Sequence, residues 1–318
     1  LVAHKAAPAM AVGNPIIIKP STKTPLTALI LGEIIMEAGW PDGAVNVIVS
    51  SGKEMEKAVS DPRIKKLTFT GSAEVGWMLK KLAFDKKVTL ELGGNAACII
   101  HDDAYIDFAA MRCVVGAFSF AGQVCISVQR IFVKDTVFDE FAERFVATAR
   151  SLKPGDPLDE TTDVGPMIDD DSIRETQSRV REAIEKGAKV LLGNGFEGRL
   201  HEPTVLTNTT PEMRVNSEET FAPVVTIERY ERFESALDMA NNSIFGLQAG
   251  VFTKDIKRIF EAYSRLDAGA VIINDIPMYR TENMPYGGVK SSGFGREGVR
   301  YAMEEMTEMR LLVVNLNP

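Results

Sequence analysis

Residues Lys66 to Leu92, KLTFTGSAEVGWMLKKLAFDKKVTLEL, decide the fold class. Lys66 to Thr70 and Val88 to Leu92 have the short apolar and β-branched pattern of buried strands. Between them, Gly71-Ser72 opens a helix predicted over Ala73 to Leu82. A strand, a helix and a second strand in this order predict a parallel βα unit, the building block of doubly wound nucleotide-binding sheets.

The same alternation continues on both sides of this stretch. Upstream, strands are predicted at Pro15–Lys19 and Val45–Val49, with helices over Leu26–Ala38 and Lys53–Val59. After Gly93-Gly94 the alternating pattern predicts four more strands, at Ala96–Ile100, Arg130–Val133, Lys189–Leu192 and Ala270–Asn274. It also predicts five more helices, at Tyr105–Phe118, Val137–Leu152, Ser172–Lys186, Glu234–Asn241 and Asp255–Leu266. We therefore expect two α/β domains, the first an incomplete doubly wound parallel sheet.

Composition excludes several classes of protein. The 318 residues are 45% hydrophobic and 25% charged, which is not the composition of a disordered chain. Lys and Arg total 36 and Asp and Glu 44, so 36 − 44 gives a net charge of −8, which disfavours nucleic-acid binding. No apolar run reaches the ~18 residues of a membrane span. Three cysteines without a CxxC pair favour a reducing, cytoplasmic location, and the three histidines have no metal-ligand spacing, so no metal is expected.

The C-terminal residues Met309 to Asn317 have a strand pattern with apolar side chains on both faces. Such a strand should be buried. Pairing within its own chain and pairing with the sheet of another subunit are both open.

Cys125 is a candidate nucleophile within Ala121 to Ser127, AGQVCIS. Its small and polar neighbours leave room for a substrate, and a thiolate is a strong nucleophile. Cys98 lies in an apolar run and Cys113 lies within a predicted helix, so both are expected to be inert core residues. From composition alone, Cys125 is no more than a candidate.

Three further segments carry polar or glycine-rich patterns. Glu91, in LELGGN, is either a desolvated acid with a raised pKa or an exposed acid on a sheet rim, and this segment alone favours the rim. Gly71-Ser72 offers free N–H groups and a hydroxyl to a phosphate, although most such pairs are only helix caps. Met284 to Gly298 holds five glycines in MPYGGVKSSGFGREG, which permits close backbone approaches.

Together these segments resemble the aldehyde dehydrogenase superfamily. The motifs GNPIIIKPSTKTP, FTGS, ELGGN, GQVC, EETFAPV and MPYGGVKSSGFGRE follow one another along nearly the whole chain. The resemblance implies an NAD(P)-dependent enzyme that oxidises an aldehyde to a carboxylic acid. Cys125 would attack the aldehyde to give a thiohemiacetal, its own N–H stabilising the oxyanion, and Glu91 would activate the water that hydrolyses the resulting thioester. The presence of Glu91 favours hydrolysis over transfer to coenzyme A.

The resemblance also implies which residues bind NAD or NADP. Lys19 would bind the adenosine ribose, Ser72 the pyrophosphate, and Glu219 the nicotinamide ribose, with Phe221 packed beside it. Ser21, Thr22, Gly71 and Leu92 complete the expected cofactor site. Many NAD-preferring members have a Glu at the position of Thr22, which would repel a 2′-phosphate; Thr22, with Lys23 nearby, therefore predicts that NADP is accepted.

The substrate segment of the family aligns with Ile276 to Arg280. The surrounding NDIPMYRTENMPYGG resembles branches that oxidise small, often anionic aldehydes. Arg280 is a candidate anion clamp, with Tyr279 beside it, because a guanidinium binds a carboxylate or phosphate bidentately. An Arg at a subunit or surface contact explains the same residue equally well.

The resemblance predicts the domains and the assembly. We expect the C-terminal part of a cofactor-binding domain at 1–92, a catalytic domain at 93–300 and an oligomerisation arm at 301–318, in a homodimer or homotetramer. The Pro-Trp-Asn segment that completes the oxyanion hole in this family is absent, and we expect the chain to lack roughly the first third of a typical member. The alternative to an enzyme is a truncated, non-catalytic chain that acts as a scaffold or subunit-binding module.

Overall fold

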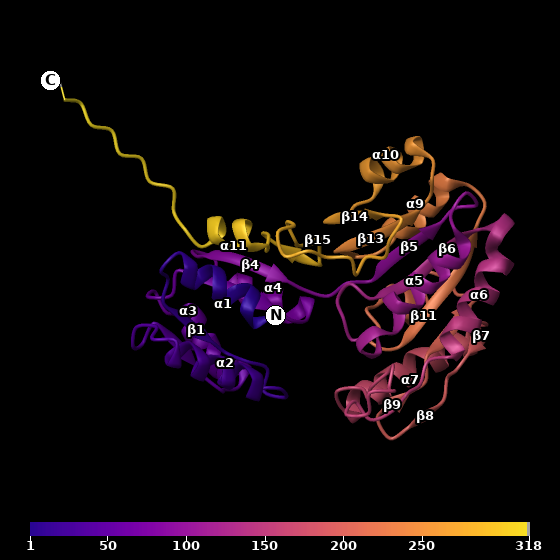
Figure 1. Cartoon of the computed structure of the whole chain (residues 1–318), viewed down its shortest axis with the longest axis horizontal. Helices are drawn as coiled ribbons and strands as arrows, with labels where there is room; N and C mark the ends of the chain where they lie inside the picture. Colours follow the sequence, from indigo (N-terminus) through magenta and orange to yellow (C-terminus); the bar gives the residue numbers. More distant parts are fainter. Residues whose placement is uncertain (317–318) are drawn as a thin grey trace. The chain divides into compact units, whose positions relative to one another are not determined.

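The computed structural model describes residues 1–316, which form two compact units (Figure 1). Unit 1 comprises residues 1–91, 281–287 and 294 onward; unit 2 comprises 92–280 and 288–293. Residues 281–287 and 294–300, which we predicted within the domain 93–300, pack instead in unit 1. Asn317 and Pro318, the ends of the predicted strand and arm, lie outside the described residues.

Unit 1 contains the parallel βα units predicted from sequence. Its strands and helices are α1 (Val2–Ala11), β1 (Ile16–Ile18), α2 (Leu26–Glu37), β2 (Val45–Val47), α3 (Gly52–Ser60), β3 (Lys66–Thr70), α4 (Ala73–Leu82), β4 (Lys87–Glu91) and α11 (Val299–Glu305). Strand β1 pairs in parallel with β2, and β3 with β4. Thr70 is opposite Glu91 in the β3–β4 register, so the segments that follow these strands leave the same sheet edge.

Unit 2 is built on a larger sheet. Its principal elements are β5 (Ala96–Ile100), α5 (Ile106–Phe118), β6 (Val128–Lys134), α6 (Phe138–Arg150), α7 (Asp170–Glu185), β7 (Lys189–Leu192), β10 (Thr204–Thr207), α8 (Arg214–Ser217), β11 (Val224–Tyr230), α9 (Phe233–Asn241), β13 (Gln248–Phe252), α10 (Ile256–Arg265) and β14 (Ala270–Ile273). Among the described residues the strand order is β14-β13-β5-β6-β11-β10-β7. Neighbours are parallel except β7, which runs antiparallel to β10 at one edge.

The remaining elements are short. They are η1 (Ser119–Gly122), η2 (Asp135–Val137), β8 (Phe196–Glu197), β9 (Leu200–His201), β12 (Phe245–Gly246), β15 (Val289–Lys290) and β16 (Gly293–Phe294). Strands β8 and β9 form a hairpin, and β12 pairs with β15. The pairing of β12 with β15 attaches part of the glycine-rich segment to unit 2.

Helices cover both faces of the unit 2 sheet, because side chains along each strand alternate between two cores. Cys98 and Ile100 of β5 face the core formed with α5, α6 and α7. Ala97 and Ile99 face the second core, formed with α9 and α10. The complete burial of Cys98 and Cys113 confirms that both are core residues.

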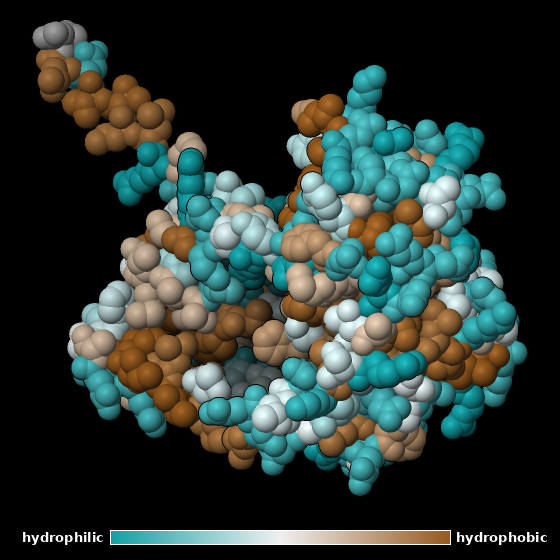
Figure 2. Space-filling model, turned by 45° about the vertical axis from the view of Figure 1, so that its right-hand side comes forward, coloured by the Kyte–Doolittle hydropathy of each residue, from teal (hydrophilic) through white to brown (hydrophobic). Residues whose placement is uncertain are grey.

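The C-terminal segment forms no strand with any described residue of this chain. Residues 309–316 have no regular structure, and their apolar side chains are 64–102% exposed: Met309, Leu311, Leu312, Val313, Val314 and Leu316. Figure 2 shows this run in brown at the upper left, beyond the body of its unit. The predicted burial is therefore not achieved among the described residues, because the segment pairs with none of their strands.

No helix in residues 1–316 is both long enough and apolar enough to cross a membrane.

The stability of unit 2 depends on a cluster of aromatic rings. The side chains of Phe141 and Phe145 are fully buried, with ring centroids 5.9 Å apart, and Phe118 packs 6.0 Å from Phe145. Phe145→Ala should lower the free energy of unfolding by about 3–5 kcal/mol, through lost burial and a residual cavity. Urea unfolding followed by circular dichroism measures this. Leu158→Ala, at a side chain 91% exposed, is the control and should change stability by less than about 0.5 kcal/mol.

Candidate active site

Cys125 lies in a tight loop between α5 and β6. Three consecutive residues before it, Phe120, Ala121 and Gly122, have φ values of 54°, 54° and 66°, in the left-handed region. For the two non-glycine residues this conformation costs about 1–3 kcal/mol each, so the surrounding structure must hold the loop. Cys125 is partly exposed, whereas Cys98 and Cys113 are 0% exposed. Cys125 is therefore the one cysteine of the three that a substrate can reach.

Two glycines bring other segments against this loop. A Cβ on Gly94 would lie 2.0 Å from the carbonyl oxygen of Cys125. A Cβ on Gly122 would lie 2.1 Å from the carbonyl oxygen of Ala222. Both obstacles are backbone atoms, which cannot rotate away, so any side chain here would displace the loop. The ELGGN and EETFAPV segments therefore pack directly on the loop of Cys125.

Glu219 belongs to this assembly. Its Oε1 accepts a 2.8 Å hydrogen bond from the N–H of Gly94, and a Cβ on Gly93 would lie 2.5 Å from its Oε2. Burial raises the pKa of the Glu219 carboxyl to about 7, against the opposing effects of the Gly94 N–H and the Arg179 charge. Below pH 7 the carboxyl carries a proton, and above it the carboxylate can accept hydrogen bonds from a ligand.

Glu218 shows that this environment is specific to one of two adjacent acids. Hydrogen bonding to Arg214 lowers the pKa of Glu218, and Arg179 has the same effect. Its oxygens lie 3.0 Å from Arg179 Nε and 3.1 Å from Arg214 Nε. Glu219 is thus not a solvated acid beside Glu218: the first acid is bound by arginines and the second faces a hollow.

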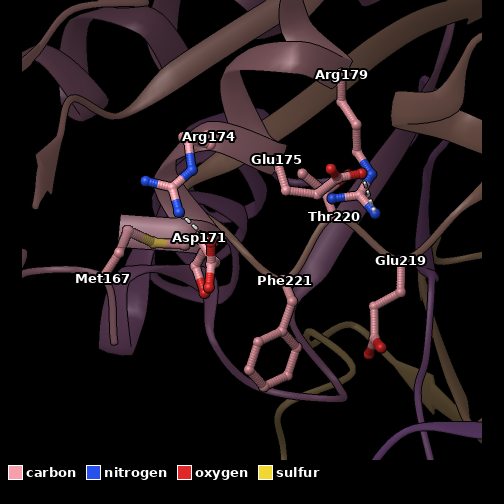
Figure 3. Close-up of a pocket in the computed structure, with 9 residues that line it drawn as sticks. Met167, Asp171, Arg174, Glu175, Arg179, Glu219, Thr220 and Phe221 are labelled. Carbon is pink, nitrogen blue, oxygen red and sulfur yellow. Dashed lines mark hydrogen bonds and ion pairs between the residues drawn. The ribbon is translucent and has the colours of Figure 1, made fainter. Parts of the chain in front are cut away.

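The hollow has a volume of about 540 Å³ (Figure 3). Its lining comes from α7, from Met167 just before that helix, and from the segment before β11: Met167, Asp171, Ser172, Arg174, Glu175, Arg179, Glu219, Thr220 and Phe221. The side chains of Glu219 and Phe221 extend in the same direction in Figure 3, and Phe221 is 41% exposed with a φ of 49°. The carboxylate can accept hydrogen bonds from two hydroxyls of a sugar, and the exposed aromatic ring can pack against a flat ring attached to that sugar.

In unit 1, Glu91 ends β4 and is 3% exposed, so it is a buried acid and not an exposed acid on a rim. The carbonyl oxygen of Glu91 accepts a 3.1 Å hydrogen bond from the N–H of Gly71, which follows β3. Ser72 is the N-cap of α4, and its hydroxyl accepts a 3.4 Å bond from the N–H of Val75. Gly71 and Ser72 are both exposed at this helix N-terminus.

The remaining cofactor candidates of unit 1 follow a different strand. Lys19 follows β1, and its Nζ donates to the carbonyls of Pro20 at 2.6 Å and Ser50 at 3.5 Å. Ser21 and Thr22 are exposed in the loop before α2. Strand β1 belongs to a separate sheet from β3 and β4. In unit 2, Leu92 is 2% exposed and its N–H donates a 2.9 Å bond to the carbonyl of Ser292.

A buried carboxylate of the glycine-rich segment forms an ion pair that the sequence patterns did not predict. Lys5 of α1 pairs with Glu297, whose side chain is 5% exposed. Glu297 in turn exchanges backbone hydrogen bonds of 3.0 and 2.6 Å with Tyr286, and Gly287 follows at a φ of 154°. A Cβ on Gly287 would lie 3.1 Å from Glu91 Oε1. The only sequence signal was a Lys and a Glu at opposite ends of the chain, which periodicity cannot connect.

The predicted substrate residues lie in unit 2, near α5. Tyr279 is 47% exposed and Arg280 is partly exposed. The same segment is attached to α5 by the 2.7 Å ion pair of Arg112 with Asp275, and by Ile276, which packs beside Gly116. Because α5 leads into the loop of Cys125, this attachment fixes the start of the predicted substrate segment to the helix that precedes Cys125.

Comparison with known proteins agrees with these features. A model of the aldehyde dehydrogenase family matches residues 1–312. The chain is 43% identical over 317 residues to the 3-sulfolactaldehyde dehydrogenase of Priestia aryabhattai, covering 99% of this chain and 66% of that protein. Aldehyde dehydrogenase 21 of Physcomitrella patens, solved with its product succinate, is 44% identical at a TM-score of 0.96, over 99% of this chain and 66% of its own.

A second solved structure is similar over nearly the same residues. It is the glyceraldehyde-3-phosphate dehydrogenase of Methanocaldococcus jannaschii, in complex with NADP, at 41% identity and a TM-score of 0.93; the match covers 96% of this chain and 68% of that chain. The chain described here thus spans just under two thirds of the length of the Priestia and Physcomitrella proteins.

The raised pKa of Glu219 predicts a pH-dependent stability. From pH 4.5 to 7 the folded state holds a proton that the unfolded state releases, so this stabilisation is present at low pH and is lost as the pH rises through 7. Glu219→Gln keeps an oxygen for the Gly94 N–H and has no proton to lose. Between pH 5 and pH 8 the wild type should lose roughly 2 kcal/mol relative to the Gln variant. Urea unfolding at both pH values tests this; an equal gap between the two proteins at pH 5 and pH 8 would refute it.

Proposed function

The chain belongs to the aldehyde dehydrogenase family, and from that premise we propose that the whole protein oxidises a small anionic aldehyde to its carboxylic acid with NAD⁺ or NADP⁺. One observation carries the proposal: the accessible Cys125 lies in a strained loop packed against the backbone of the Glu219 segment. Loops held in such conformations cluster at catalytic sites.

The proposed chemistry begins at Cys125. Its thiolate adds to the aldehyde carbon and forms a C–S bond, and the oxygen becomes the oxyanion of a thiohemiacetal, stabilised by the Cys125 N–H. NAD(P)⁺, when bound, supplies the acceptor for the hydride that leaves this carbon. The carbon is then a thioester on Cys125. Glu91 takes a proton from water, the water oxygen bonds to the acyl carbon, and the C–S bond breaks to release the acid and the thiolate.

The cofactor assignments fit the residues present. The hollow beside Glu219 and Phe221 offers a carboxylate for ribose hydroxyls and an aromatic ring beside it. The exposed N-terminus of α4 at Gly71-Ser72 offers N–H groups to a pyrophosphate. Thr22 is exposed and carries no charge that would repel a 2′-phosphate, which supports use of NADP as well as NAD. The similar Methanocaldococcus enzyme was solved with NADP.

An anionic substrate is supported by the relatives and by one side chain. The three relatives are named with sulfolactaldehyde, glyceraldehyde-3-phosphate and the product succinate. Each of these molecules carries a negatively charged group in addition to the carbon that is oxidised. Arg280, with Tyr279 beside it, would bind that group, since the segment is attached to the helix that leads to Cys125. We place the reaction in a reducing, cytoplasmic compartment because Cys125 must remain a thiol.

The catalytic proposal predicts two different defects. In the full-length gene product, Cys125→Ala should lower NAD(P)H formation by at least about 10³-fold, because the covalent step is lost. Glu91→Gln should lower steady turnover by about 10²-fold yet keep a first burst of NAD(P)H, because acylation precedes hydrolysis. Stopped-flow absorbance of NAD(P)H over a panel of anionic and neutral aldehydes, with each cofactor, measures both.

Cys113→Ala is the matched thiol control and should retain most of the activity. The same assay on residues 1–318 alone shows whether this chain is sufficient. A folded full-length protein that is silent with every aldehyde and both cofactors would contradict the enzyme and favour a scaffold or subunit-binding role.

We further propose that the C-terminal segment pairs with the sheet of a second copy. Strand β14 is an edge of the unit 2 sheet and reads AVII, without the charge that usually protects an edge, whereas the opposite edge, β7, begins with Lys189. An exposed apolar segment and an unprotected apolar edge on the same chain are complementary. The assembly would be a homodimer or a homotetramer.

Charges placed in this segment should break the assembly. The double variant Leu312→Asp/Val314→Asp puts a carboxylate on each of two exposed apolar positions and should convert the oligomer to monomers, because a buried unpaired charge is costly. Light scattering coupled to size-exclusion chromatography reports the mass. Leu158→Asp adds the same charge at another exposed leucine and should leave the mass unchanged. A monomeric wild type, or an intact oligomer in the double variant, would contradict the proposed pairing between copies.

A further inference from the structure

Two buried carboxamides hold the backbone on both sides of Glu219. Gln129, on β6, is 1% exposed. Its Nε2 donates a 3.1 Å hydrogen bond to the carbonyl of Gly94, and its Oε1 accepts a 2.9 Å bond from the N–H of Thr220. The Gly94 N–H also donates to Glu219, so three hydrogen bonds and the peptide link between Glu219 and Thr220 close a ring through Gly94 and Gln129.

Asn95 holds the same segment from its other end. It is 4% exposed, and its Nδ2 donates to the carbonyl of Asn216 at 2.6 Å and to that of Glu218 at 3.3 Å. Its Oδ1 accepts a 3.0 Å bond from Arg130 Nε. Both polar atoms of the amide are therefore used, and the Asn95 side chain has one orientation that satisfies them.

Arg130 is the support for Asn95. It is 4% exposed, and its Nε and terminal nitrogens donate to five oxygens: Oδ1 and the carbonyl of Asn95, and the carbonyls of Met239, Ala240 and Asn242. The last three lie at the C-terminal end of α9, where the helix dipole favours a cation. Burial lowers the pKa of the guanidinium to about 10, so Arg130 remains charged at neutral pH. The five donors of a guanidinium match five acceptors, which fixes its geometry.

We propose that Asn95 and Gln129 are positioning residues that fix the Glu219 carboxylate in the orientation that receives the nicotinamide ribose. The inference rests on the proposed function for its ligand. Neither carboxamide lines the hollow; each binds backbone groups at residues 216, 218 or 220. The next residue, Phe221, has a φ of 49°, a conformation that the hydrogen bond of Thr220 helps to keep.

The decisive experiment is a double-mutant cycle in the full-length gene product. Isothermal titration measures the Kd of NAD⁺ and NADP⁺ for wild type, Gln129→Met, Glu219→Ala and the double variant. Gln129→Met should weaken binding by about tenfold in the wild-type background and by less than about twofold in the Glu219→Ala background, because only the first has a carboxylate to orient. Equal losses in both backgrounds, or no loss, would overturn the inference.

A matched control separates positioning from general packing. Gln248→Met replaces a buried glutamine of similar exposure on β13 and should leave both Kd values unchanged. If Gln129→Met fails to fold, Asn95→Asp serves instead: it keeps an oxygen for Arg130, loses both donors to residues 216 and 218, and should show the same dependence on Glu219.

A second measurement does not need a bound cofactor. Hydrogen–deuterium exchange in the cofactor-free protein should be faster at residues 218–222 in Gln129→Met than in wild type or in Gln248→Met, because the Thr220 N–H loses its acceptor. If the wild type binds neither NAD⁺ nor NADP⁺, the cofactor part of the proposed function is wrong. The exchange rates at residues 218–222 still show whether Gln129 holds this segment in place. Unchanged exchange at residues 218–222 refutes the positioning role.

Discussion

The close approach of the Gly93-Gly94 backbone to Cys125 and Glu219 is the constraint on which the site in unit 2 depends. A Cβ at these two positions would lie 2.5 Å from a carboxylate oxygen and 2.0 Å from a carbonyl oxygen. No side chain is small enough to fit, so the two glycines permit three segments to meet backbone to backbone. Gly122 adds a third such contact, against Ala222. The strained loop of Cys125 is held by this packing, since a loop with successive left-handed residues would otherwise relax.

The same packing gives the two adjacent acids, Glu218 and Glu219, different environments. Glu218 lies beside Arg179 and Arg214 and stays ionised. Glu219 is turned toward the Gly94 N–H and is desolvated, so it titrates near neutral pH. A carboxylate with a single N–H partner keeps acceptor capacity for ligand hydroxyls, whereas one bound by two arginines does not. Pairing with arginines at Glu218 and burial at Glu219 therefore distinguish an acid whose oxygens are already bound from one that can bind a ligand.

Sequence patterns predicted the βα units of unit 1 to within one or two residues, because the 2.0 and 3.6 residue periods are clear there. Helix α1 was missed, since Pro8 lies inside it and proline usually ends a helix. Strands β10, β11 and β13 were missed as well, although each lies between two other strands of the unit 2 sheet. The motifs identified Cys125, Glu91 and Glu219 as candidates. They did not identify Gln129 or Arg130, whose only signal is a polar pair at the start of a buried strand and whose partners are distant backbone groups.

The two units use opposite edges of their parallel sheets. In unit 1 the candidate residues Lys19, Gly71 and Glu91 lie at or just after the carboxyl ends of β1, β3 and β4, where ligands bind in open α/β sheets. In unit 2 the network begins at the amino ends of β5 and β6, and Glu219 precedes their neighbour β11. A carboxyl edge leads into helix N-termini such as that of α4, which suit phosphate groups. An amino edge presents incoming loops, and in unit 2 the N–H of Gly94 in such a loop binds the Glu219 carboxylate while the N–H of Thr220 donates to Gln129. Groups suited to a phosphate therefore lie in unit 1, whereas unit 2 holds the Glu219 carboxylate and the accessible Cys125 in loops that pack on one another.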